Sequence, residues 1–327
     1  MVDRNNLLNG IATLVSDYRT GEIAQIDAAW IDKWVRQFPD AVQLPLLAEL
    51  AHVLRKTYLS KAAFQKFLET VASSEKFAGT DPKSFWQGVR FLDLQTAGNS
   101  QRDMLALFDA ILQAKFGLSV AACGASPHTY VYLDDALYSG GRIKSDLINW
   151  INGPAPVQAK VAIITIALHQ LGEYFANNDI QKAIRASGKN IEVKFWRAIA
   201  VEDRKAYMGV SDVLRPTIIP NDPETQGYVA GLGAAPILRT AGNVGGQGFF
   251  SSDNGRILME QEFLKAGVRV RDLCPHLNTY MRPLGCTLMK TTGFGSMIVT
   301  YRNCANNTPL VLWAGDPWYP LFPRKTN

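Results

Sequence analysis

The first 80 residues carry the spacing of amphipathic helices. Apolar residues recur at steps of three and four in the segments 7–21, 26–38 and 44–59, and this period places them on one face of a helix. Pro39 and nearby Asn, Gly and Asp residues mark the turns between these segments. Because no catalytic pattern stands out, we predict a helical N-terminal extension over residues 1–80 that packs on the rest of the protein or on a partner.

From about residue 85 the pattern changes to short apolar runs that alternate with helical segments. Strands are predicted at 88–95, 129–136, 160–168 and 191–199, with helices at 102–117, 142–151 and 170–187. Such alternation is typical of a parallel sheet covered by helices. The predicted fold class is therefore α/β, with a parallel sheet flanked by helices, the helical extension before it and a C-terminal hood after it.

This change in pattern divides the chain into the helical extension at 1–80 and an α/β domain at 81–327. The last part of that domain, from about 205 to 327, has irregular strands and loops, which are too irregular to supply a separate core. Ligands of open parallel sheets bind at the carboxyl ends of the strands. We therefore expect residues 205–327 to complete a ligand cleft there as a hood.

Two adjacent acids end one of the predicted strands. The segment YVYLDDALYSGGRI, at 130–143, runs from an apolar strand through Asp134 and Asp135 into a turn formed by Ser139, Gly140 and Gly141. The acids can accept hydrogen bonds from paired hydroxyls, while backbone N–H groups of a glycine-rich turn at a helix start can bind an anion. A sugar diol beside a phosphate would satisfy both. The alternative is that the two acids cap the turn and that the Ser-Gly-Gly stretch is a flexible connector.

This segment resembles the phosphoribosyl diphosphate (PRPP) signature of type I phosphoribosyltransferases. The resemblance implies that Asp134 and Asp135 are the catalytic residues, which hold the ribose 2′ and 3′ hydroxyls, and that residues 139–141 hold the 5′-phosphate. The segment departs from that pattern at Tyr138, where a small hydroxyl residue is usual, and at Arg142, where a threonine is common. Arg142 could bind phosphate through two parallel hydrogen bonds.

A closer similarity is to the phosphoribosyltransferase-like proteins of bacterial conflict systems, including effectors encoded beside retrons. It rests on FLDLQTAGNSQRDMLALFDAI, at 91–111, and on the ending GFGSMIVTYRNCANNTPLVLWAGDPWYPLFPR, at 293–324. The resemblance places Gly98, Asn99, Ser100 and Gln101 in the family's pyrophosphate loop, where they would offer hydrogen-bond donors at a helix start.

Two functions follow from this resemblance. The first is an anti-phage effector enzyme that acts on PRPP or a related nucleotide at the ribose anomeric carbon, with Mg²⁺ bridging ribose and pyrophosphate oxygens and no separate protein metal site. The second is a catalytically silent module that binds a nucleotide or docks a reverse transcriptase with its DNA or RNA. The retained acids and glycines favour the first, whereas Tyr138 and Arg142 favour the second.

Two histidines lie beside the predicted strands. His128 precedes the strand at 129–136, and His169 follows the strand at 160–168. Either side chain could face the cleft, but a structural histidine with its hydrogen bonds satisfied is the favoured interpretation for both.

Composition and charge add expectations about surroundings and partners. The longest apolar run, at 161–168, is far shorter than the ~20 residues that span a bilayer, and the N-terminus lacks a signal-peptide pattern, so we expect a cytoplasmic protein without a membrane partner. The four cysteines form no CxxC pair and are expected to be reduced, structural thiols. Residues 256–327 hold nine Lys and Arg against four acids, which favours a phosphate-bearing ligand or nucleic acid about as well as a solvated basic face.

Overall fold

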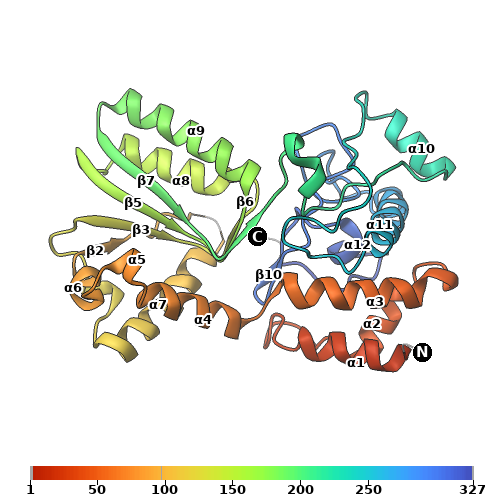
Figure 1. The fold of residues 1–327 in the computed structure, drawn as a ribbon, viewed down its shortest axis with the longest axis horizontal. Coiled ribbons are helices and arrows are strands. Elements are labelled where there is room, and N and C mark those ends of the chain that lie inside the picture. Colours follow the sequence, from red (N-terminus) through yellow and green to blue (C-terminus); the bar gives the residue numbers. More distant parts are fainter. Residues whose placement is uncertain (1–2, 97, 326–327) are drawn as a thin grey trace. The chain divides into compact units, whose positions relative to one another are not determined.

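The computed structural model describes residues 3–96 and 98–325, and the chain divides into two compact units (Figure 1). Unit 1 combines the N-terminal segment up to Lys61 with the C-terminal segment from Val201, and unit 2 runs from Ala62 to Ala200. The predicted division at residue 80 does not coincide with these boundaries. The first three helices belong with the C-terminal region, whereas the later helices of the predicted extension belong with the sheet.

The centre of unit 2 is a four-stranded parallel sheet in the order β2–β3–β5–β7. Its strands are β2 (Val89–Phe91), β3 (Thr129–Leu133), β5 (Gln158–Ile164) and β7 (Asn190–Trp196). All five residues of β3 are buried, because this strand lies between two others and both of its faces are covered by helices, as is usual in parallel sheets.

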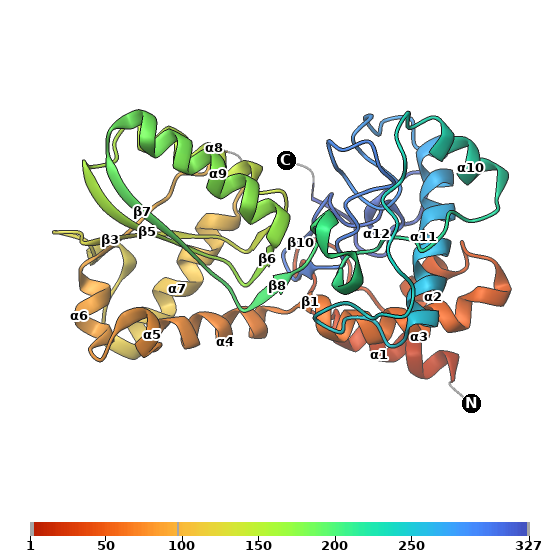
Figure 2. The same cartoon turned by 45° about the horizontal axis from the view of Figure 1, so that its top comes forward.

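Helices cover both faces of this sheet (Figures 1 and 2). On one face lie α8 (Gly141–Asn152) and α9 (Gln170–Ser187), and on the other lie α5 (Glu75–Ala78), α6 (Pro82–Gln87) and α7 (Ser100–Phe116), with α4 (Lys61–Ala72) leading into that layer. A short 3₁₀ helix, Val120–Ala122, follows α7. This arrangement confirms the predicted α/β fold class with a parallel sheet flanked by helices.

The two faces have different cores. Under α8 and α9 the core is largely aliphatic, with Leu147 of α8 and Ile180 of α9 packed in one cluster with Ile163 of the sheet. On the other face the core is aromatic, since the fully buried ring of Trp86 lies 4.9 Å from the ring of Phe108. Burial of such side chains contributes roughly 1.5–3 kcal/mol each, so both helix layers are held firmly to the sheet.

Three of the predicted strands are each broken into two. The segments 129–136, 160–168 and 191–199 each contain a break, after which the chain continues as β4 (Ala136–Leu137), β6 (Ala167–His169) and β8 (Ile199–Val201). The short strands form a second sheet in the order β4–β6–β8. The prediction of continuous strands was therefore wrong at these points.

The breaks occur at the same level of the sheet, so the hydrogen-bond ladder continues across them. The Asp134 N–H donates to the Ile164 carbonyl at 3.0 Å, and the Ile166 N–H donates to the Asp135 carbonyl at 3.2 Å. Neighbouring strands bend together, and few backbone groups lose their partners. The acid pair lies inside one of these bends.

Unit 1 joins the two ends of the chain. Its helices are α1 (Arg4–Leu14), α2 (Ala28–Val35), α3 (Asp40–Thr57), α10 (Pro223–Ala230), α11 (Asp253–Leu273) and α12 (Leu310–Trp313), with a 3₁₀ helix at Lys205–Val210. Its small sheet contains β1 (Tyr58–Leu59), β9 (Val299–Thr300) and β10 (Asn303–Cys304). The Trp34 indole N–H donates to the Val311 carbonyl at 2.8 Å, so the N-terminal helices pack directly on the C-terminal region. That this region forms a hood over the ligand cleft stays a prediction.

A buried cluster of charges lies inside unit 1. Glu260, whose side chain is fully buried, accepts hydrogen bonds from the Nε atoms of Arg239 and Arg256 at 2.9 Å and from the Arg215 backbone N–H at 3.0 Å. Arg239 also donates to Asp253 Oδ1 at 2.7 Å. Buried charges persist only when paired and hydrogen-bonded, and the charges of this cluster are paired, although Arg239 Nη2 has no hydrogen-bond partner among the described residues.

Neither a membrane span nor a disulfide is found in the described part of the chain. No helix within residues 3–96 and 98–325 is long and apolar enough to cross a bilayer. The four cysteines are free thiols, and Cys274 and Cys304 are buried. Burial raises the pKa of the Cys304 thiol to about 12, so this thiol stays protonated at neutral pH.

Candidate functional site

The acid pair lies in the bend between β3 and β4. Asp134 has only 5% of its surface exposed, and its Oδ1 accepts a hydrogen bond from the Asp135 backbone N–H at 2.9 Å. Asp135 is half-buried, and its Oδ1 accepts from the Ala136 N–H at 2.7 Å. Such bonds are expected for acids that cap a turn. Asp135 is the more accessible of the two carboxylates.

A side chain from the loop after β2 also holds Asp134. Gln95, which is 3% exposed, donates through Nε2 to Asp134 Oδ2 at 3.1 Å and to Ser100 Oγ at 3.0 Å. The Oε1 of Gln101 accepts from the backbone N–H groups of Leu94 and Gln95 at 2.7 and 3.0 Å. The fold therefore brings Ser100 and Gln101 of the predicted pyrophosphate loop together with Asp134, through Gln95.

The four predicted residues of the pyrophosphate loop are not equally accessible. Gln101 is fully buried and engaged with the loop backbone, so its side chain does not face solvent. Gly98, with φ of 85°, and the exposed Asn99 lie directly before α7, and Ser100 is half-buried. A ligand at this loop would meet Asn99, Ser100 and the backbone rather than the Gln101 side chain.

The Ser-Gly-Gly turn packs against the first turn of α9. Gly140 has φ of 73°, and a Cβ placed there would lie 2.6 Å from the Gly172 carbonyl oxygen. A Cβ on Gly172 would lie 1.9 Å from the Tyr138 carbonyl oxygen. The position of Gly140 requires glycine because α9 is so close, and a phosphate at residues 139–141 stays a prediction. At Gly141 there is room, since the nearest atom to a Cβ would be Ser139 Oγ at 3.6 Å.

The start of α8 can attract an anion. Backbone N–H groups at a helix N-terminus lack intrahelical partners and carry partial positive charge, and Arg142 adds an exposed cation in the first turn. The helix is tied to the sheet by the Tyr132 hydroxyl, which donates to Asp146 Oδ2 at 2.7 Å. Burial raises the pKa of the Asp146 carboxyl above its ordinary value.

His169, the last residue of β6, packs on Tyr138 next to the Ser-Gly-Gly turn. It is fully buried, with Nδ1 3.1 Å from the Leu137 carbonyl oxygen and its ring stacked on Tyr138 at 5.2 Å between centroids. Burial lowers the pKa of His169 to about 4, so the ring is neutral at pH 7. This agrees with a structural histidine. His128 is exposed, and its Nδ1 lies 2.9 Å from Thr129 Oγ1 at the start of β3.

A parallel sheet, an acid pair after a buried strand and a glycine turn that opens a helix are the features expected of a phosphoribosyltransferase-like protein. Comparison with protein families matches residues 31–324 to the PRTase-CE family, and the chain belongs to that family. The match includes most of both compact units, so it extends over unit 1 as well as over the sheet. No match was found among curated proteins or among solved structures.

Two residues of this site were missed in the sequence. Gln95 was assigned to a strand, although a polar residue that ends an apolar run is a signal of a loop near a ligand edge. Gly172 was assigned only to the predicted helix 170–187, although an isolated glycine in a helix usually has a packing reason. Gln95 contacts Asp134 and Gly172 contacts the glycine turn, so both act by positioning predicted site residues.

Proposed function

We propose that the segment from β3 to α8 binds the ribose 5-phosphate part of PRPP or a related nucleotide. We further propose that the protein transfers a group at the ribose anomeric carbon as an effector of a bacterial anti-phage defence system of the retron type. The observation that carries the proposal is the placement of Asp134 and Asp135 in one bend, followed within seven residues by Gly141 at the start of α8, in a chain of the PRTase-CE family.

The residues of this segment divide the binding between them. Asp135, the more accessible carboxylate, accepts hydrogen bonds from the ribose hydroxyls, and Asp134 supports it from the same bend. Charge-assisted bonds of this kind contribute roughly 1.5–3 kcal/mol each. The backbone N–H groups of the first turn of α8 and the Arg142 guanidinium bind the phosphate, because the N–H groups carry partial positive charge and the guanidinium is a cation.

In the proposed reaction an acceptor attacks the anomeric carbon. The bond from that carbon to the pyrophosphate oxygen breaks, and pyrophosphate leaves with the electron pair. The contribution of the chain is to hold ribose and leaving group in position, with Asn99 and Ser100 at the start of α7 next to the pyrophosphate.

Mg²⁺, when bound, would neutralise charge on the pyrophosphate oxygens. Within residues 3–96 and 98–325 there is no group of three or more His, Cys, Asp and Glu that could hold a metal ion. Mg²⁺ needs few protein ligands where substrate phosphates and water supply the others. The accessible carboxylate of Asp135 fits that limited requirement, whereas Asp134 is buried with both of its oxygens already hydrogen-bonded.

Replacement of Asp135 by Asn tests the proposal. We expect the Asp135→Asn protein to melt at an unchanged temperature without ligand but to lose the stabilisation by PRPP with Mg²⁺, the release of pyrophosphate and the protection of cells against phage. Asp272→Asn makes the same chemical change at an exposed position of α11 and should behave as wild type. An Asp135→Asn protein that keeps ligand stabilisation and activity would overturn the ribose-site assignment.

The silent module is the second candidate. It is favoured by the local hydrogen bonds of both acids and by Tyr138 and Arg142, which depart from the usual signature. PRPP would then raise the melting temperature without any release of pyrophosphate, and phage protection would still depend on Asp135. Release of pyrophosphate at a rate that depends on Asp135 would rule out this candidate.

A reverse transcriptase with its DNA or RNA is the proposed partner. Support comes from the resemblance to effectors encoded beside retrons and from the basic surplus in residues 256–327. Co-expression with the neighbouring gene products should yield a complex that contains nucleic acid and that dissociates as salt is raised, because phosphate contacts release counterions. Recovery of only the free protein from such cells would contradict the proposal.

A further inference from the structure

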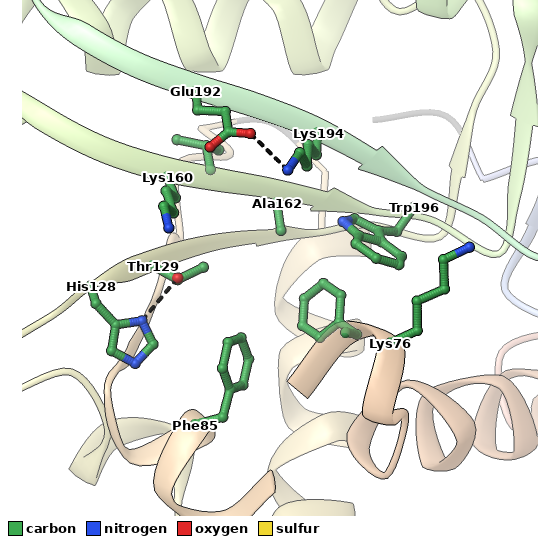
Figure 3. Close-up of a pocket in the computed structure, with 11 residues that line it drawn as sticks. Lys76, Phe85, His128, Thr129, Lys160, Ala162, Glu192, Lys194 and Trp196 are labelled. Atoms are coloured by element: carbon green, nitrogen blue, oxygen red, sulfur yellow. Dashed lines mark hydrogen bonds and ion pairs between the residues drawn. The ribbon is translucent and has the colours of Figure 1, made fainter. Parts of the chain in front are cut away.

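A hollow lies in unit 2, on the sheet face that also carries α5 and α6 (Figure 3). Its volume is about 390 Å³, which is within the usual range of small-molecule sites. On β3 it is lined by Thr129, the first residue of the strand, whereas Asp134 follows the end of the strand. Five residues of a strand span about 16 Å, so on this strand the hollow is well separated from the acid pair.

The depth of the hollow comes from small side chains in the middle of the sheet. Ala162 of β5 and Thr129 of β3 form its floor, and both are buried. Side chains alternate between the faces of a strand, so Lys160 and Ala162 share this face. The parallel register sets Glu192 of β7 beside Lys160, and Lys194 beside Ala162. A larger residue at 162 would fill the space.

Aromatic rings form one wall. The rings of Phe77 and Trp196 meet edge to face at 4.8 Å, and the ring of Phe85 lies 5.5 Å from that of Phe77 and 5.5 Å from that of His128. Figure 3 shows Phe85, Trp196 and His128 around the hollow. Phe77, Phe85 and Trp196 are only half-buried, so part of this aromatic surface can take a planar ligand.

The charges around the hollow are mainly positive. Lys76, Lys160 and Lys194 line it, with Glu192 as the acid among its lining residues. Lys194 is paired with Glu192 at 2.7 Å, and no ion pair of Lys76 or Lys160 is found among residues 3–96 and 98–325. Lys160 also lies across from Glu192 in the register, but three lysines against one acid leave the lining with an excess of positive charge beside the aromatic wall. This arrangement suits an anion with a planar group.

We propose that this hollow binds a nucleotide. The base packs against Phe85 and Trp196, because stacking of a base on an aromatic side chain contributes about 1–3 kcal/mol. The phosphate lies at the Lys160 end, where the Thr129 hydroxyl and His128 are also close (Figure 3). The nucleotide is either a free mononucleotide or one unit of a single strand, and this site is independent of the proposed PRPP site.

The test measures binding of three probes to the full chain by calorimetry: adenosine 5′-monophosphate, single-stranded octathymidine and inorganic phosphate. Lys160→Glu reverses one charge on an exposed side chain, and Ala162→Leu fills the floor. Each should weaken nucleotide binding tenfold or more. Lys66→Glu reverses an exposed charge on α4 outside the hollow and should change the affinity for nucleotide less than twofold. Lys160→Glu keeps the test decisive if Ala162→Leu fails to fold.

The pattern of results decides both the site and the source of the nucleotide. Tight binding of the monophosphate identifies a free nucleotide as the ligand, and binding of the octamer alone identifies a single strand. Either result supports the proposal if the Asp135→Asn protein binds the same probe as tightly as the wild type. Absence of binding of both probes would overturn it. The proposal would also be overturned if Lys66→Glu weakened nucleotide binding as much as Lys160→Glu does, or if Asp135→Asn weakened it. Inorganic phosphate that binds as tightly as the nucleotide would overturn it too.

Discussion

The backbones of Gly140 and Gly172 are in direct contact, since a Cβ on Gly140 would lie only 2.6 Å from the Gly172 carbonyl oxygen. The glycine turn before α8 is therefore held in place by the first turn of α9. Because Gly172 likewise has no room for a Cβ against Tyr138, the contact is made by backbone on both sides. The position of the proposed phosphate site depends on this contact between two helix starts.

Substitution of the two adjacent glycines should have different effects on stability. Gly140→Ala places a Cβ at positive φ and against backbone, and we expect it to lower the free energy of unfolding by about 2 kcal/mol or more. Gly141→Ala meets only ordinary contacts and should change it by less than about 0.5 kcal/mol. Urea unfolding of both variants checks the difference, and equal losses would mean that the backbone contact does not hold the turn.

The two acids should also differ in their effect on stability. Asp134→Asn replaces the oxygen that accepts from Gln95 or from the Asp135 N–H by a donor, and a buried group left without its bond costs about 1–3 kcal/mol. Asp135→Asn changes a more accessible side chain and should leave the free energy of unfolding nearly unchanged. Denaturant midpoints of the two variants give the comparison. A smaller loss for Asp134→Asn than for Asp135→Asn would show that the Gln95 contact contributes nothing.

His169 should make the protein sensitive to acid. Its pKa is about 4 in the folded chain against an ordinary value of 6.5, so between these values the unfolded chain binds a proton that the folded chain does not. Stability is therefore lost as the pH falls from about 6.5 towards 4. Between pH 7 and pH 5 the loss from this residue is roughly 2 kcal/mol.

The contribution of His169 is isolated by a side chain that does not titrate. His169→Gln should lose less stability than the wild type between pH 7 and pH 5, by that amount, when urea unfolding is measured at both values. Equal losses in the two proteins would assign the acid sensitivity to other groups.

The buried charges of unit 1 should contribute strongly to its stability. Glu260→Gln leaves Arg239 and Arg256 buried without the carboxylate that both contact, and breaking such a group typically costs about 3–5 kcal/mol. Glu192→Gln removes an exposed partner of Lys194 and should cost less than about 1 kcal/mol. Thermal and urea unfolding measure both. A Glu260→Gln protein as stable as the wild type would contradict the role of this cluster.

Much of the site could be predicted from the sequence because its parts are neighbours in the chain. The acid pair, the glycine turn and the start of α8 lie within a dozen residues, so a local pattern was enough to find them. The same holds for the helices of the first 60 residues and for the alternation of strands and helices, since periods of two and 3.6 residues record which side is buried. Local periodicity therefore determined the fold class, and the order of acids and glycines after one strand indicated the candidate segment.

Contacts between distant residues were decided only by the tertiary structure. Gln95 reaches Asp134 across 39 positions of the chain, Gly172 meets Gly140 from another helix, and the N-terminal helices pack with the C-terminal region. The strand breaks belong to this group too, because β3, β5 and β7 bend at the same level to keep their shared hydrogen bonds. The hollow above Ala162 likewise depends on the register of β3, β5 and β7. Each depends on which segments pair in space, and no local pattern of residues carries that information.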